Sequence, residues 1–189
     1  MEQNFQKKIS EMIRVNHAGE TGAKVIYEGQ ISALKIKGDH ATLKIVEKMY
    51  QQELEHLNYF EGKIKEQKVR PTLMQPIWKI GGFALGFITA IVDKKSAMAC
   101  TTAVEETIDV HYQEQLNELE QIAIDDNSEN KTKELVEQLK SEITKFRSEE
   151  LEHRDIGYEH NAKDFILYKP LDCFVKFTTK LAIGISKKL

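Results

Sequence analysis

The sequence predicts an all-α protein, most simply four long helices with two accessory segments. Apolar residues recur at three- and four-residue spacing over long stretches, no alternating strand pattern competes with them, and the chain contains only three prolines. Of its 189 residues, 41% are hydrophobic and 30% are charged, which is typical of a globular protein. This length suffices for one domain, residues 1–189, with a substantial core.

Composition and charge argue against several classes of protein. The formal net charge of −3 lacks the basic excess of nucleic-acid-binding domains. Two cysteines, Cys100 and Cys173, are too few for a disulfide framework or a thiolate zinc site. The first residues lack the apolar run of a signal peptide, and no stretch reaches the roughly 18 uncharged apolar residues of a spanning helix. We therefore expect a protein that stays inside the cell.

The first two helices are expected over residues 10–37 and 40 to about 67, joined by a turn at Gly38 and Asp39. In each stretch the apolar side chains fall on one helix face. They are Met12, Ile13, Val15, Ala23, Ile26, Tyr27 and Ala33 in the first helix, and Leu43, Val46, Met49, Tyr50, Leu54, Leu57 and Phe60 in the second.

A long crossover, about residues 68–96, follows the second helix, because Pro71 and Pro76 prevent simple helical continuation. The third and fourth helices are expected from 97 to about 125 and from 131 to about 160, separated by the loop DDNSEN. An apolar segment with regular lysines, about 164–188, ends the chain as an accessory helix interrupted by Pro170. Four helices with one long crossover form the ferritin-like arrangement.

The letters ELEH occur twice, at residues 53–56 and 150–153, once in each half of the chain. Residues three apart lie on one face of a helix, so Glu53 and His56 point together, as do Glu150 and His153. One Glu-x-x-His pair is a weak signal, since exposed pairs of this kind are common. Two pairs in a repeated context favour a metal site, and a di-metal bundle then needs one inward glutamate from each remaining helix.

Both further glutamates are available: Glu20 in the first helix, and Glu105 or Glu106 in the third. They stand among small or apolar neighbours, where a carboxylate is costly to bury unless it is paired or binds a metal. Glu20 lies about 17 residues before the first turn and Glu53 about 14 after it, roughly 26 and 21 Å of helix rise. The same count brings Glu105 level with Glu150, so each lone glutamate should face its own Glu-x-x-His pair.

The donor set itself suggests the metal. Four carboxylates nearly balance the charge of two divalent ions, which suits a core of low dielectric constant. Carboxylates with two imidazoles suit iron or manganese better than zinc in a closed tetrahedral site.

Several longer motifs resemble one known family. The stretches RVNHAGETGA, RPTLMQPIW, GGFALG, AMACTTAVEETIDVHY and EELEHRDIGYEH are similar to those of the demethoxyubiquinone hydroxylases of ubiquinone biosynthesis, which are ferritin-like, di-iron, membrane-associated monooxygenases. The resemblance covers roughly residues 11–189. It implies two iron ions held by Glu20, Glu53, His56, Glu105, Glu150 and His153, and so selects Glu105 over Glu106. Glu53 and Glu150 would bridge the ions.

The resemblance also implies the reaction and its setting. The family hydroxylates the ring of a polyprenyl demethoxyubiquinol with O2 as co-substrate. We expect a membrane-dissolved quinol substrate, peripheral association with the cytoplasmic face of the cell membrane, and no nucleic-acid partner. The electron donor is left open, with NADH as a candidate. Homo-oligomerisation and contacts with other ubiquinone-biosynthesis proteins are left open too.

Two residues beyond Glu105 suggest a relay. His111 and Tyr112 lie about two turns further along the same helix and could pass protons or electrons to the substrate. An ordinary buried, hydrogen-bonded pair is an equally good interpretation. His17 is better interpreted as a structural histidine, and Asp155 as a surface residue rather than a group that orients His153.

The apolar run at residues 77–92 has two interpretations. It is either a crossover helix buried against the bundle or an interfacial helix, with Trp78 near lipid headgroups and lysines outside. The C-terminal segment is similar, and a polyprenyl substrate favours the interfacial interpretation. Two rival functions remain: a ferritin-like ferroxidase or iron-handling protein, and a quinone-binding protein without a metal.

Overall fold

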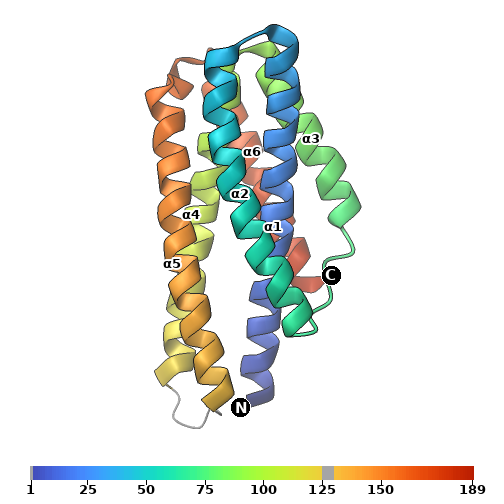
Figure 1. The fold of residues 1–189 in the computed structure, drawn as a ribbon, viewed down its shortest axis with the longest axis vertical. Coiled ribbons are helices and arrows are strands. Elements are labelled where there is room, and N and C mark those ends of the chain that lie inside the picture. The colour runs from blue at the N-terminus through green and yellow to red at the C-terminus, as the bar shows by residue number, and fades with distance from the viewer. Residues whose placement is uncertain (1, 125–129) are drawn as a thin grey trace.

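The computed structural model describes residues 2–124 and 130–189, which contain helices and no strand. The long helices are α1 (Glu2–Lys37), α2 (His40–Glu66), α4 (Lys94–Ile124) and α5 (Asn130–Glu159). Two shorter helices, α3 (Gln75–Val92) and α6 (Tyr168–Lys188), flank them, and a short 3-10 helix, η1 (Ala162–Asp164), precedes α6. The predicted all-α, ferritin-like bundle with a crossover and a C-terminal accessory helix is confirmed (Figure 1).

The fold consists of two similar halves. α1 packs against α2 and α3, and α4 packs against α5 and α6. α3 also contacts α4, and α6 contacts α1, so the accessory helices border both halves. Figure 1 shows the four long helices side by side, with α3 along the flank of α1. The internal repeat seen in the ELEH letters therefore extends to three helices per half.

Two expected helix starts were wrong. α1 begins at Glu2 rather than near residue 10, because Phe5 and Ile9 add another turn of apolar side chains against the core. α4 begins at Lys94 rather than 97, so the crossover ends at Asp93. The Asp93 carboxylate accepts a 2.8 Å hydrogen bond from the Lys95 amide and its carbonyl accepts one from Ala97, which starts the helix three residues early.

Two of the three prolines lie within helices in the structure. Pro76 lies in the first turn of α3, as the expected break requires. Pro170 does not interrupt the last helix, contrary to expectation, because it is the third residue of α6. There its missing N–H has no intrahelical partner to lose. The predicted loop falls mostly at residues 125–129, outside the described residues, and α5 begins one residue before the expected start.

The apolar core is divided by a polar layer at mid-height. One apolar cluster contains Ile13, Phe60, Leu119 and Phe146, and the other contains Tyr27, Val46 and Met98 among others. On each long helix the expected metal ligands lie between these clusters. Polar side chains are thus held where water is excluded on both sides.

Candidate metal centre

The six expected ligands meet in this polar layer, and each is at most 3% exposed. One group of potential ligand atoms, all within 4.8 Å of one another, comes from Glu20, Glu53, His56 and Glu150. The other comes from Glu53, Glu105, Glu150 and His153. Each lone glutamate therefore faces the Glu-x-x-His pair of its own half, as the level argument predicts. Glu53 and Glu150 belong to both groups, so each could contact both metal positions.

Glu105 and Glu106 are distinguished by their surroundings. Glu105 is buried in the polar layer, whereas Glu106 is about one-third exposed and faces away. Glu106 pairs with Lys176 of α6 at 2.6 Å and accepts a hydrogen bond from Tyr158 of α5. The structure therefore places Glu105, not Glu106, beside Glu150.

The cluster contains buried polar atoms that protein partners do not satisfy. Neither carboxylate oxygen of Glu53 has a hydrogen-bond partner, and neither does Nδ1 of His56, although Glu150 and Glu20 oxygens lie 3.3 and 3.6 Å from that nitrogen. Burying such groups without partners costs a few kcal/mol. A cation among them would satisfy all three atoms, so the residues present can bind a metal.

The pKa shifts in the metal-free cluster show the same demand for positive charge. Burial and the negative charge of Glu150 raise the pKa of Glu53 to about 8. Burial acts to lower the pKa of His56, but the neighbouring carboxylates of Glu150 and Glu20 outweigh it and raise this pKa to about 12. Burial and nearby carboxylates likewise raise the pKa of Glu105 well above its ordinary value. Without metal, protons supply the charge that the carboxylates require.

Each lone glutamate also receives a hydrogen bond from a tyrosine of the other half. Tyr27 of α1 donates a 3.0 Å bond to Glu105, and Tyr112 of α4 donates a short one to Glu20. Both hydroxyls are buried, and burial with the nearby carboxylates raises the pKa of each tyrosine well above its ordinary value. Both groups therefore stay protonated as donors and orient the two terminal carboxylates.

The two residues of the expected relay have different surroundings. Tyr112 donates a hydrogen bond to Glu20 of the cluster, whereas His111 is hydrogen-bonded to Gln115 at 2.9 Å and to Asn16 at 3.3 Å. Burial, and secondarily Lys187, lower the pKa of His111 to about 4, so its ring is neutral. The relay itself stays a prediction.

The structure supports the surface interpretation of Asp155, whereas His17 is buried with no hydrogen-bond partner for its Nδ1 and so is not the satisfied structural histidine that was expected. His17 is buried, and burial lowers its pKa. Asp155 is exposed and pairs with Arg154 at 2.6 Å, so the described contacts assign it no part in orienting His153.

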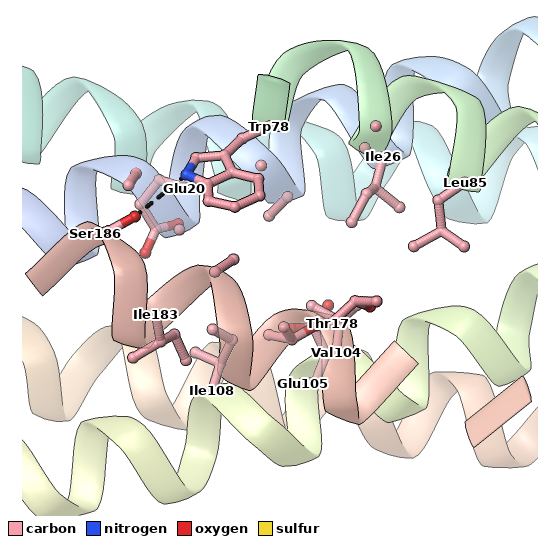
Figure 2. A pocket seen from close by; sticks show the side chains of 18 of the residues that line it. Glu20, Ile26, Trp78, Leu85, Val104, Glu105, Ile108, Thr178, Ile183 and Ser186 are labelled. Carbon is pink, nitrogen blue, oxygen red and sulfur yellow. Dashed lines mark hydrogen bonds between the residues drawn. The ribbon is translucent and has the colours of Figure 1, made fainter. Parts of the chain in front are cut away.

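An apolar cavity of about 560 Å³ reaches the cluster from one side. Its walls come mainly from α1, α3, α4 and α6, with one residue from α5, and Figure 2 shows apolar side chains such as Ile26, Ile108 and Ile183 around it. Glu20, Glu105 and Glu150 form part of its lining. Trp78 of α3 donates a 3.2 Å hydrogen bond to Ser186 of α6, joining the two accessory helices at the end near Glu20 (Figure 2).

Comparison with known proteins shows the family to which the chain belongs. The model of the family described as "Ubiquinone biosynthesis protein COQ7" matches residues 7–186. The chain belongs to the COQ7 family. It is 44% identical to the mitochondrial NADPH-dependent 3-demethoxyubiquinone 3-hydroxylase of Dictyostelium discoideum over 96% of this chain and 77% of that one. It is 41% identical to the 3-demethoxyubiquinol 3-hydroxylase of Rhodospirillum rubrum, over 96% and 78% of the two chains.

Several buried polar residues of the bundle did not emerge from the sequence as functional candidates. Tyr27 was counted only as an apolar residue, yet it lies seven positions after Glu20, as Tyr112 lies seven after Glu105. That shared spacing was a usable signal. Other polar residues depend on contacts between helices. Gln52 and Glu149 contact the two histidines. Gln30 pairs with Thr101, and Gln115 pairs with Asn16. Nothing in the local sequence indicated those partners.

Proposed function

We propose that this COQ7-family protein is an O2-dependent di-iron monooxygenase that hydroxylates the ring of a polyprenyl demethoxyubiquinol. One observation carries the proposal: three carboxylates of the candidate metal centre line an apolar cavity of about 560 Å³. A cavity of this size and character suits a quinol ring with an apolar tail. The names of the relatives describe the same reaction.

The ligands proposed for two iron ions are Glu20, Glu53, His56, Glu105, Glu150 and His153. When bound, iron would supply the electrons that activate O2 for ring hydroxylation. The chain's own residues hold the ligands in place and exclude water. Tyr112 and Tyr27 orient Glu20 and Glu105, while apolar side chains of α3 and α6 cover the cavity.

The names of the relatives bear on the choice of reductant and on the rival functions. Several of them are named as NADPH-dependent, so NADPH replaces NADH as the reductant that we propose. The ferroxidase or iron-handling alternative is not retained, since the relatives are named as hydroxylases.

The test compares two glutamates of one ELEH sequence. Glu150→Ala should abolish both iron binding and hydroxylation, whereas Glu152→Ala, at an exposed position, should leave about two irons per chain. A deletion strain should accumulate the demethoxy intermediate, and the Glu152→Ala gene should relieve this while Glu150→Ala should not. Full hydroxylase activity in an iron-loaded Glu150→Ala protein would refute the ligand assignment.

Peripheral membrane association forms part of the proposal. α3 is the one helix in residues 2–124 and 130–189 long and apolar enough to cross a membrane, with 18 residues and a mean hydropathy of 1.3, although Lys79 interrupts it. Its outer face stays exposed, with Ile80 at 74%, as does that of α6, with Phe177 at 65%. Both helices border the cavity, so a lipid surface on this side would deliver the quinol directly.

Co-sedimentation with anionic liposomes tests this surface. The double variant Ile80→Ser/Phe177→Ser should bind liposomes several-fold more weakly than the unaltered protein. Ile36→Ser changes an equally exposed apolar residue outside α3 and α6 and serves as the matched control. Equal binding by the unaltered protein and the double variant would contradict the membrane proposal. The cytoplasmic face stays a prediction.

A further inference from the structure

The two histidines of the candidate metal centre have unlike partners on their outer nitrogens. Nδ1 of each ring faces cluster carboxylates, and Nε2 faces the opposite half of the bundle. His56 Nε2 lies 2.7 Å from a carboxylate oxygen of Glu149. His153 Nε2 lies 3.1 Å from the amide oxygen of Gln52. Glu149 and Gln52 directly precede Glu150 and Glu53, so they occupy equivalent positions with different charge.

An imidazole that donates its outer N–H keeps the lone pair of its inner nitrogen available for a metal. Glu149 and Gln52 can each accept that hydrogen bond and orient the ring. A carboxylate does more than an amide, since its negative charge increases the electron density of the imidazole and stabilises a higher charge on a metal bound to it. The shorter distance at His56 agrees with the stronger, charge-assisted bond.

Glu149 stands on the side of the cluster away from the cavity. Three cluster glutamates line the cavity, but neither His56 nor His153 does, and Glu149 does not either. The Glu149 side chain is 21% exposed, and its other oxygen lies 3.9 Å from Lys145. A change at Glu149 therefore alters the environment of one metal position without touching the space for substrate.

We propose that Glu149 is a positioning residue that makes the two metal positions inequivalent: the position held by Glu20 and His56 binds iron more tightly and favours the ferric state more than the position held by Glu105 and His153. This inference rests on the proposed di-iron function, because it concerns how this chain holds those ions. Glu149 and Gln52 occupy matching positions and differ in charge, and this charge difference is what would distinguish the two metal positions.

Mössbauer spectra and midpoint potentials of protein loaded with 57Fe test the proposal. The unaltered protein should show two distinct quadrupole doublets for its two positions. Glu149→Gln gives both histidines an amide partner, so the two doublets should become more alike. It should also raise the lower midpoint potential and weaken iron binding at the position held by Glu20 and His56 about tenfold or more. The KM for the quinol should stay the same, since Glu149 lies outside the cavity lining.

Two further variants keep the test independent of folding and of overall charge. Gln52→Glu gives both histidines a carboxylate partner and should also reduce the difference between the doublets, while lowering a midpoint potential. Glu152→Gln removes the same charge from an exposed position of α5 and should change none of these readouts.

The outcomes separate this inference from the proposed function. If the unaltered protein binds no iron after anaerobic reconstitution, the di-iron function itself is wrong. If it binds two irons but Glu149→Gln leaves the spectra and potentials unchanged, or Glu152→Gln changes them equally, only the role assigned to Glu149 is overturned.

Discussion

The first half of the molecule, α1 to α3, and the second half, α4 to α6, each supply a lone glutamate and a Glu-x-x-His pair to the candidate metal centre but attach their accessory helices differently. α3 approaches α1 at backbone distance: an added Cβ at Gly86 would lie 2.7 Å from the carbonyl carbon of Ile26. α6 is joined to α4 by side chains, with Lys176 bonded to Glu106. The two accessory helices thus cover the cavity through different kinds of contact, close backbone packing for α3 and side-chain pairs for α6.

The largest expected effect lies in the α1–α3 contact. Gly86→Ala places a methyl group against the backbone of Ile26 and should lower the free energy of unfolding by about 3 kcal/mol. Gly184→Ala on α6 meets nothing within 4 Å and should be neutral or slightly stabilising. Denaturant unfolding followed by circular dichroism compares them. Equal stability of the two variants would show that both accessory helices attach in the same way.

The next prediction concerns the two tyrosines that link the halves. Tyr27→Phe removes a buried hydrogen bond to Glu105, and Tyr112→Phe removes a buried hydrogen bond to Glu20. Each should lower iron affinity about 10- to 100-fold, as loss of a bond that orients a ligand usually does. Anaerobic Fe(II) titration measures this loss. An effect for one tyrosine alone would break the equivalence of the two halves at the polar layer.

A smaller effect is expected at the turn within the first half. Asp39 begins α2 and accepts hydrogen bonds from the Thr42 amide at 3.1 Å and the Thr42 hydroxyl at 2.8 Å. Asp39→Ala should cost about 1 kcal/mol at pH 7, while Asp39→Asn should cost less because it keeps an acceptor. Thermal unfolding of both variants measures the difference.

The Asp39 effect should also depend on pH. Partial burial acts to raise the pKa of Asp39, but the bonds from Thr42 outweigh it and lower this pKa below its ordinary 3.8. A lowered folded-state pKa means that the stabilisation is present above pH 3.8 and is lost as the pH falls through the folded-state value. The gap between Asp39→Ala and the unaltered protein should therefore narrow below about pH 4. A constant gap from pH 7 to pH 3 would contradict the role of the ionised carboxylate.

The smallest effect is expected in the α4–α6 contact. Lys176 pairs with Glu106 at 2.6 Å and with Asp172 at 2.8 Å, and its side chain is partly exposed. Since solvent screens such pairs, Lys176→Met should cost only about 0.5 kcal/mol, and less at high salt. Lys180→Met, at an exposed position of the same helix, is the control. A loss as large as that of Gly86→Ala would mean that the second half depends on this network as strongly as the first depends on close backbone packing.

Much of the fold follows from local patterns. Helix spacing and the prolines at 71 and 76 predicted the bundle and its crossover, because both depend on short-range backbone geometry. Helix ends were less accurate: α1 extends to Glu2 because Phe5 and Ile9 pack on distant helices, and α4 begins at Lys94 because of the Asp93 carboxylate. Such boundaries depend on contacts that periodicity does not contain.

The sequence by itself determined the two Glu-x-x-His pairs and their level against Glu20 and a glutamate at 105 or 106, since the three-residue period and the rise per residue are properties of any helix. Helix geometry left Glu105 and Glu106 open and the family resemblance favoured Glu105; the tertiary structure shows Glu105 beside Glu150 and Glu106 paired with α6. It also decided that Tyr27, Glu149 and Gln52 contact residues of the candidate metal centre on other helices. The physical reason is that such partners depend on how each helix is rotated and aligned against its neighbours, and the packing of the whole core sets both.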